Sequence, residues 1–277
     1  MPSQSERAAT FRALHAGPDA FVIPNPYDAG TARILAGLGF AALATSSAGF
    51  AFTIGRRDGA ITRDQALAHA RAVVDATDLP VSADLENGFG DDPATVAETI
   101  RLAAETGLVG CSIEDASGDS RQPIYDRGLA VERVAAAVEA ARSLPFPFTL
   151  TARAENYLHG RPDLDDTLDR LRAFQAAGAD VLYAPGLPDL AAIRTVCEAV
   201  TRPVNVLAAS GGQRLTVDEL AAAGVRRVSL GAHLSRAALG AFLRAAREVK
   251  ETGSFGFTAD AAPSAEIGAF MVGRTAE

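Results

Sequence analysis

The chain has 277 residues, of which 48% are hydrophobic, and it carries a formal net charge of -8 at pH 7. This length and composition suit one large globular domain, so we expect a single domain over 1–277, with 252–277 as a C-terminal extension. The acidic balance argues against nucleic acid or an anionic membrane surface as a partner. We therefore expect a small-molecule partner.

Cys111 and Cys197 each lie in an apolar run, which is typical of core residues in a reducing compartment rather than of a disulfide framework. The first residues hold no basic segment followed by an apolar one, and no run approaches the roughly 18 apolar residues of a membrane helix. We expect a cytoplasmic protein without membrane contact. Lys250 is the only lysine and the 4 histidines are scattered, so neither a Schiff-base lysine nor a histidine-rich zinc site is easily built.

Short apolar or β-branched runs alternate along the chain with longer segments of helical period. Eight such alternations demand a parallel sheet and favour its closure into a (β/α)₈ barrel, which is the fold we predict. The predicted strands are 21–25, 40–46, 79–86, 108–114, 146–153, 179–185, 202–208 and 225–231. The predicted helices include 64–77, 95–106, 129–142, 164–177, 188–200, 216–223 and 233–250.

Barrels of this kind carry their chemistry at the carboxyl ends of the strands. Polar side chains do stand at the ends of most predicted strands, although they are distant in sequence. We expect them to converge on one mouth. These residues are Asp28, Ser46, Ser47, Asp84, Glu86, Glu114, Asp115, Arg153, Asn156, Asn205 and His233.

The stretch VSADLENGFG, 81–90, places Asp84 and Glu86 on one face of a strand because side chains alternate. Glu114 ends the next strand. Three uncompensated carboxylates would raise one another's pKa, and a hard divalent cation with oxygen ligands resolves that repulsion. We predict Mg²⁺, with Mn²⁺ as the alternative ion and Asp58 as a further ligand. The other interpretation is that these acids cap helices or pair with arginines.

Other polar residues at the predicted mouth suit an anionic ligand. Arg153 fits a substrate carboxylate through paired hydrogen bonds, or equally pairs with one of the acids. The SSAG turn, 46–49, offers hydroxyl and N–H groups to an anion, or is a simple turn. The ASGGQ turn, 209–213, follows the strand after which barrels often hold phosphate, although a flexible turn is the simpler interpretation. His233 is a candidate proton donor, or a structural residue at a helix start.

Several longer segments resemble the isocitrate lyase and phosphoenolpyruvate mutase superfamily, in its branch with carboxyphosphonoenolpyruvate phosphonomutase and 2-methylisocitrate lyase. The segments are TSSAGFAFTIGRRDG, SADLENGFG, CSIEDA, TARAENY and PVNVLA. The resemblance implies a barrel whose C-terminal helix is exchanged between subunits of a dimer or tetramer. It implies Mg²⁺ held by Asp58, Asp84, Glu86 and Glu114. It also implies contacts to an α-oxo or α-hydroxy carboxylate from Ser46, Ser47, Arg153 and Asn205, to which we add Ala48 and Asp84.

The loop after the fourth predicted strand departs from this superfamily. Residues 115–128 read DASGDSRQPIYDRG and lack both the lysine and cysteine of the lyases and the lysine and asparagine of the mutases. Pro185 and Ala44 stand where the lyases carry a glutamate and an aromatic residue. Arg121, Tyr125 and Arg127 are the candidates to replace the missing loop groups.

These departures favour a reaction that needs little beyond an electron sink and a proton donor. We expect cleavage of the bond to C3 of a 2-oxo or 2-hydroxy acid through a pyruvate-like enolate, as in oxaloacetate decarboxylation. The expected ligands are oxaloacetate, pyruvate or 2-oxoglutarate. One alternative is phosphonopyruvate hydrolysis or phosphonomutase chemistry, and another is a metabolite-binding barrel with weak turnover. The expected catalytic residues are Arg153, Asp58, Glu114 and His233.

Overall fold

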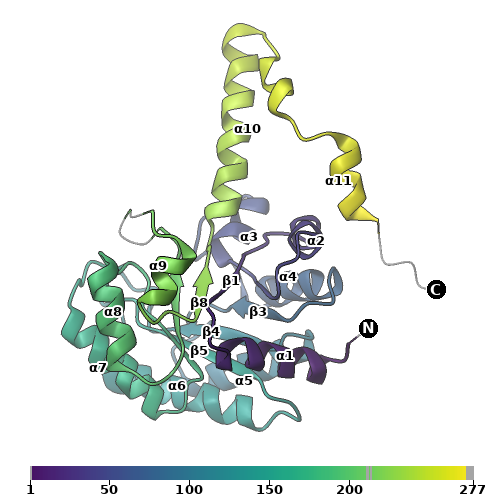
Figure 1. Cartoon of the computed structure of the whole chain (residues 1–277). Helices are drawn as coiled ribbons and strands as arrows, with labels where there is room; N and C mark the ends of the chain where they lie inside the picture. Colours follow the sequence, from purple (N-terminus) through teal and green to yellow (C-terminus); the bar gives the residue numbers. More distant parts are fainter. Residues whose placement is uncertain (1, 210–211, 213, 273–277) are drawn as a thin grey trace.

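The chain folds around one eight-stranded parallel sheet (Figure 1). The structure is a computed structural model, and it describes residues 2–209, 212 and 214–272. The strand order is β1-β8-β7-β6-β5-β4-β3-β2, and the Ala44 N–H donates to the Pro24 carbonyl at 3.0 Å, which brings the two ends of the sheet together. The predicted (β/α)₈ barrel is therefore confirmed. The strands are β1 (Phe21–Ile23), β2 (Leu43–Ala44), β3 (Val81–Asp84), β4 (Gly110–Glu114), β5 (Thr149–Arg153), β6 (Val181–Tyr183), β7 (Val204–Leu207) and β8 (Arg227–Ser229).

Helices connect successive strands and cover the outside of the sheet (Figure 1). Many begin at a residue whose side chain accepts a hydrogen bond from the first helical turn, as Thr62 does from Gln65 N–H. The helices after β1 are α2 (Ala29–Gly37), α3 (Ser47–Thr53), α4 (Arg63–Asp75), α5 (Pro93–Glu105), α6 (Arg127–Arg142), α7 (Leu164–Ala176), α8 (Leu190–Ala199), α9 (Val217–Ala222), α10 (His233–Thr252), the 3₁₀ helix η2 (Gly256–Asp260) and α11 (Ser264–Met271).

A further helix, α1 (Gln4–Ala16), precedes the barrel and packs against its amino-terminal end. It begins with a capping box in which Ser3 and Glu6 satisfy each other's backbone N–H groups. Phe11 is fully buried, packed with Ile23 at the end of β1. A Cβ on Gly110 would lie 3.0 Å from the Phe11 ring and 2.6 Å from the Thr149 carbonyl oxygen, so only glycine allows this close approach.

A buried polar network fills part of the barrel interior. Arg227 donates to Asn205 Oδ1 at 2.8 Å and to Thr151 Oγ1 at 3.0 Å, and Asn205 Nδ2 donates to Ser229 Oγ at 3.0 Å. Burial lowers the pKa of His15 to about 3, so its ring is neutral. Its Nδ1 donates to the Phe11 carbonyl at 2.8 Å, which leaves Nε2 to accept from Arg227 at 3.3 Å.

The chain leaves the barrel along α10 and returns to it at α11. Helix α10 projects from the sheet, and Gly253 ends it with a left-handed φ of 67° (Figure 1). Helix α11 then returns to α2 of the same chain, where the Met271 carbonyl accepts from Arg33 at 3.0 Å. Among the described residues, no helix has the length and apolar character needed to cross a membrane.

Candidate active site

Arg153, the last residue of β5, gathers three carboxylates at the carboxyl end of the barrel. Its Nη1 lies 3.0 Å from Asp84 Oδ1, and its Nη2 lies 3.2 Å from Glu114 Oε2 and 2.8 Å from Glu155 Oε1. The guanidinium also lies 5.1 Å from the centre of the Tyr183 ring. Three parallel strands place these residues together because their carboxyl ends meet at one rim. The pairing of Arg153 with the acids is thus observed, while its contact with a substrate carboxylate stays a prediction.

Ser47 ties two of the predicted acids together from the start of α3. Its N–H and Oγ donate to Asp84 Oδ2 at 3.2 and 2.7 Å, and its Oγ lies 3.4 Å from Asp58 Oδ1. Ser46 is the N-cap of α3, and its Oγ accepts from Gly49 N–H at 3.2 Å. The SSAG segment is therefore a helix start rather than a simple turn. The N–H groups of Ser47 and Gly49 already have partners within the chain.

The acids around Arg153 are short of positive charge. Glu86 Oε1 is buried with no hydrogen-bond partner among the described residues, and burial together with Asp84 and Asp58 raises the pKa of Glu86 to about 7. Burial raises the pKa of Glu114 by more than nearby Arg153 lowers it. Burial and the charge of Asp84 also raise the pKa of Asp58. One arginine does not balance these carboxylates, so the cluster would gain from a bound cation.

Glu86 reaches this cluster differently from the prediction. Strand β3 ends at Asp84, so strict alternation along a strand does not place Glu86. Its backbone instead takes a left-handed φ of 48°, which is uncommon for a residue other than glycine. Glu86 nevertheless lines the same cavity as Glu114.

The donor set fits Mg²⁺, because all four predicted ligands offer carboxylate oxygens and one of those oxygens lacks a partner. As they lie, no three acidic, histidine or cysteine side chains in the described part of the chain form a preassembled metal-binding group. Arg153 accounts for this arrangement, since it engages Asp84 and Glu114 directly. To bind an ion, these carboxylates would have to exchange contacts with Arg153 for contacts with the cation.

Two adjoining cavities open at this mouth, with volumes of about 360 and 560 Å³. They share Ser47, Asp58, Arg153 and Leu158. The first also contains the predicted residues Ser46, Ala48, Asp84 and His233, and the second contains Glu86, Glu114, Glu155 and His159. The structure therefore brings most of the predicted site residues to one place.

Asn205 lies deeper in the barrel. It is 1% exposed, and both ends of its amide are engaged with Ser229 and Arg227. Leu207, two residues further along β7, lines the first cavity, so alternation along the strand places Asn205 one layer below the mouth on the same side. Its contact with a substrate stays a prediction.

Three other polar residues near strand ends have structural partners instead. Asp28 caps α2 by accepting from Thr31 N–H at 2.7 Å, Asp115 pairs with Arg170 at 2.9 Å, and Asn156 donates to Asp166 at 2.7 Å. Of the ASGGQ turn, Ser210, Gly211 and Gln213 lie outside the described residues.

The loop 115–128 turns its candidate side chains to other partners. Arg121 pairs with Asp119 at 2.8 Å with a largely exposed side chain, and Arg127 pairs with Asp169 at 2.7 Å. Tyr125 is buried, and its hydroxyl donates to Asp91 at 2.6 Å. The loop contributes only the small residues Ala116 and Gly118 to the lining described for the second cavity.

Sequence reasoning missed Glu155 and His159, which follow β5. Glu155 is 2% exposed and binds Arg153 through both Nε, at 2.9 Å, and Nη2. The Arg-x-Glu spacing was the available signal, because residues two apart on an extended segment share a face. His159 Nε2 lies 3.8 Å from Glu155 Oε2, and nothing in its sequence context marked it.

The fold and this mouth define a class: a (β/α)₈ barrel with a carboxylate and arginine site at the carboxyl ends of its strands. The family model of phosphoenolpyruvate phosphomutase matches residues 11–250. The chain therefore belongs to this family, within the phosphoenolpyruvate mutase and isocitrate lyase superfamily, as its sequence segments predicted.

Named relatives and solved structures agree with this membership. A crystal structure from Burkholderia cenocepacia J2315, described as a candidate lyase/mutase, is 62% identical with a TM-score of 0.95, covering 98% of this chain and 97% of its own. A 2-methylisocitrate lyase of Salmonella typhimurium is 30% identical over 225 residues, 78% of this chain and 75% of the relative. An oxaloacetate decarboxylase of Marinomonas sp. is 28% identical over 237 residues, 83% of this chain and 80% of the relative.

Proposed function

We propose that the chain is a Mg²⁺-dependent lyase that breaks the bond to C3 of a small 2-oxo or 2-hydroxy carboxylic acid, with oxaloacetate as the favoured substrate. The observation that carries the proposal is the cluster of carboxylates at the barrel mouth, which one arginine leaves uncompensated. The relatives named 2-methylisocitrate lyase and oxaloacetate decarboxylase support a carbon–carbon bond cleavage.

Asp58, Asp84, Glu86 and Glu114 would hold the cation. When bound, Mg²⁺ supplies positive charge that favours an enolate oxygen over a ketone oxygen. Asp84 has its orientation fixed by two hydrogen bonds from Ser47, at 3.2 and 2.7 Å. Ser47 thus holds Oδ2 of Asp84 in place, while Oδ1 would exchange its contact with Arg153 for one with the cation.

Arg153 would bind the substrate carboxylate and keep its own charge while doing so. Its side chain is 13% exposed, and the carboxylates of Glu155, Glu114 and Asp84 raise its pKa against the opposing effect of burial. If Asp84 and Glu114 turn to the cation, Arg153 gains free donors for an incoming carboxylate. Ser46 and Ala48 line the same cavity and would define its side wall.

His233 would donate the proton that ends the reaction at C3. It lies at the start of α10 and lines the first cavity together with Arg153 and Asp84. His159 is the second candidate, because it lines the adjoining cavity. The loop 115–128 presents no acid or base to these cavities in its described lining, and this favours decarboxylation over the release of succinate or an aldehyde acid.

The test is an assay of purified protein with oxaloacetate, 2-methylisocitrate, isocitrate and phosphonopyruvate, with Mg²⁺ or with a chelator. We expect Mg²⁺-dependent pyruvate release from oxaloacetate, above the rate in matched protein-free buffer. Asp84→Ala should abolish this activity while its thermal unfolding stays cooperative. Turnover of phosphonopyruvate alone would replace the proposal with carbon–phosphorus chemistry, and thermal stabilisation by ligands without turnover would identify a binding protein.

The exposed face of α10 suggests that the protein functions as a homo-oligomer. Leu239, Phe242 and Leu243 are 40%, 68% and 50% exposed on a helix that projects from its own barrel. Apolar side chains gathered in this way on a projecting helix are typical of an interface. We propose that this face packs on a second copy in a dimer or tetramer.

A further inference from the structure

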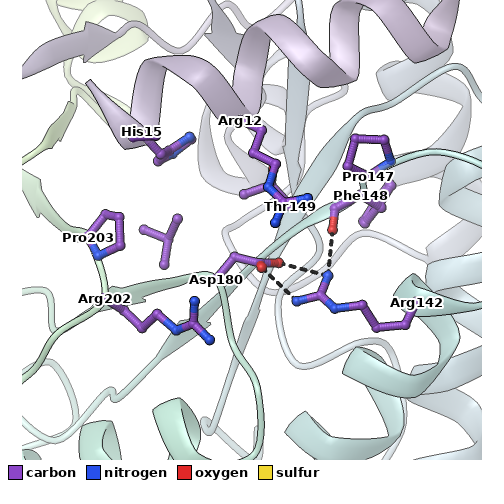
Figure 2. Close-up of a pocket in the computed structure, with 11 residues that line it drawn as sticks. Arg12, His15, Arg142, Pro147, Phe148, Thr149, Asp180, Arg202 and Pro203 are labelled. Carbon is purple, nitrogen blue, oxygen red and sulfur yellow. Dashed lines mark hydrogen bonds and ion pairs between the residues drawn. The ribbon is translucent and has the colours of Figure 1, made fainter.

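Another cavity, separate from the two at the mouth, opens at the opposite end of the barrel from the carboxylate cluster. It has a volume of about 230 Å³ and lies among α1 and the residues that begin β5, β6 and β7. Figure 2 shows the guanidinium groups of Arg12, Arg142 and Arg202 converging around Asp180. Three arginines at one small cavity are notable in a chain whose net charge is -8.

Only one of these arginines has its charge balanced. Arg142 Nη2 lies 2.6 Å from Asp180 Oδ1, and Arg142 Nη1 lies 3.2 Å from Oδ2. Asp180 Oδ2 also accepts from Leu150 N–H at 2.9 Å. Asp180 is thus fully engaged, while the guanidinium groups of Arg12 and Arg202 have no hydrogen-bond or ion-pair partner within the described chain.

The inner wall of the cavity adds positive potential. His15 lines it in the neutral form, and its Nε2 lies 3.3 Å from the guanidinium of Arg227 in the barrel interior. Burial lowers the pKa of Arg227 to about 10, so Arg227 still carries its charge near neutral pH. Among the described residues that line the cavity, Asp180 is the one carboxylate. An anion here would meet an excess of positive charge.

We propose that this cavity, the basal cavity lined by Arg12, Arg142, Asp180 and Arg202, binds a small phosphate-bearing metabolite. Phosphate presents oxygens in several directions, and guanidinium groups that approach from separate elements can each donate to a different oxygen. A planar carboxylate offers fewer directions. Pro147, Phe148 and Pro203 give the cavity an apolar wall against which the rest of the molecule would lie.

Occupancy would also bridge α1 to the barrel. Arg12 belongs to α1, whereas Arg202 directly precedes β7, so an anion between them links two segments that are far apart in sequence. Binding to the folded state alone stabilises it by mass action. The basal cavity should therefore report its ligand as a rise in thermal stability.

The test uses inorganic phosphate and pyrophosphate as probes, with succinate as a dianion that carries only carboxylate groups, in chelator-treated buffer of low ionic strength. Calorimetry should show saturable pyrophosphate binding, and the melting temperature should rise with it. The variant Arg12→Gln/Arg202→Gln should weaken binding by about tenfold or more, because it removes two charged hydrogen-bond donors. Both side chains are exposed, so the fold does not depend on them. The matched control Arg172→Gln/Arg194→Gln removes two exposed arginines elsewhere and should bind like the parent.

Three outcomes would overturn the inference. Absence of saturable binding beyond a chloride control of equal ionic strength would show that the arginines are only a basic patch. Equal affinity in the Arg12→Gln/Arg202→Gln variant would place the anion elsewhere, for example beside Arg153. Succinate binding as tight as pyrophosphate binding would remove the preference for phosphate. The lyase activity proposed for the other end of the barrel is measured separately with oxaloacetate, so its failure and the failure of this inference are distinguishable.

Discussion

Arg153 shows how a single side chain can organise a site. It contacts Asp84, Glu114 and Glu155 at 3.0, 3.2 and 2.8 Å, so one planar cation serves three acids from different strand ends. A lysine ammonium is a compact charge that cannot reproduce this fork.

Arg153→Lys should therefore keep the positive charge but lose the planar set of donors that contacts the three acids. We expect kcat/KM for the 2-oxo acid substrate to fall on the order of 100-fold, because substrate carboxylate and neighbouring acids would no longer be aligned. Steady-state kinetics at saturating Mg²⁺ measure this effect, with the exposed Arg121→Lys as control. Parental kinetics in Arg153→Lys would assign the residue a purely structural role.

His69 illustrates a residue whose protonation couples to folding. It is 7% exposed, stacks on Phe50 with ring centres 4.1 Å apart, and its Nε2 has no partner among the described residues. Burial lowers its pKa from 6.5 to about 4. The unfolded chain therefore binds the proton more tightly than the folded chain does.

The sign of this coupling gives a stability prediction. The neutral His69 ring stabilises the folded state fully above pH 6.5, and this stabilisation is lost as the pH falls towards 4. At about pH 5 we expect it to cost roughly 1 to 2 kcal/mol of the free energy of unfolding relative to neutral pH. Urea denaturation at both pH values should show a smaller pH effect in His69→Phe than in the parent. An unchanged pH effect would contradict the assigned protonation.

At the scale of elements, the alternation of apolar runs and amphipathic segments predicted every strand but not the strand ends. The run 40–46 forms only Leu43–Ala44 as a strand, and 179–185 forms Val181–Tyr183. Residues flanking a barrel strand stay buried after the ladder ends, so apolar character extends further than pairing does. The pattern of apolar residues could not predict the conformation of Glu86 either, because a left-handed residue after a strand produces no such pattern.

Helix α1 was not predicted, although its signal was present. Ser3 and Glu6 have the spacing of a capping box, and Phe11 and His15 lie four residues apart on its buried face. No barrel unit requires a helix before the first strand, so the repeat pattern gave no reason to look for it. The cluster at the mouth was predictable for the opposite reason, because barrel topology dictates where strand ends meet.

Phe11→Ala should show how much α1 contributes to stability. The ring is fully buried and makes an edge contact with His15 at 4.7 Å between ring centres. Its removal should lower the free energy of unfolding by about 3 to 5 kcal/mol through lost burial and a cavity. Leu38→Ala, at a side chain that is 62% exposed, should change it by less than about 0.5 kcal/mol. Equal effects in the two variants would mean that α1 is not anchored by Phe11.

At the scale of the whole molecule, two ends of one barrel carry opposite electrostatic character. The carboxyl end concentrates acids around Arg153, whereas the amino-terminal end gathers arginines around Asp180. The polar network through His15, Arg227, Asn205 and Ser229 runs through the interior between them. Because every member has a partner, this network can be buried without the cost of unpaired groups.

The projecting helix α10 makes the last prediction, which concerns assembly. Its apolar residues recur at 239, 242, 243 and 249, a helical spacing that gives one continuous face, and a helix of this length spans about 30 Å. Burying this face against a second copy would stabilise an oligomer, because each large apolar side chain contributes about 1.5 to 3 kcal/mol when fully buried.

Two carboxylates placed on that face would have to be desolvated on assembly, so Phe242→Glu/Leu243→Glu should dissociate the protein into monomers. Sedimentation velocity should find a dimer or tetramer for the parent and for the control Arg194→Glu, which changes an exposed arginine on α8, away from this face. It should find a folded monomer for Phe242→Glu/Leu243→Glu, since neither side chain belongs to the barrel core. A monomeric parent, or a variant that assembles like the parent, would show that this face serves another purpose.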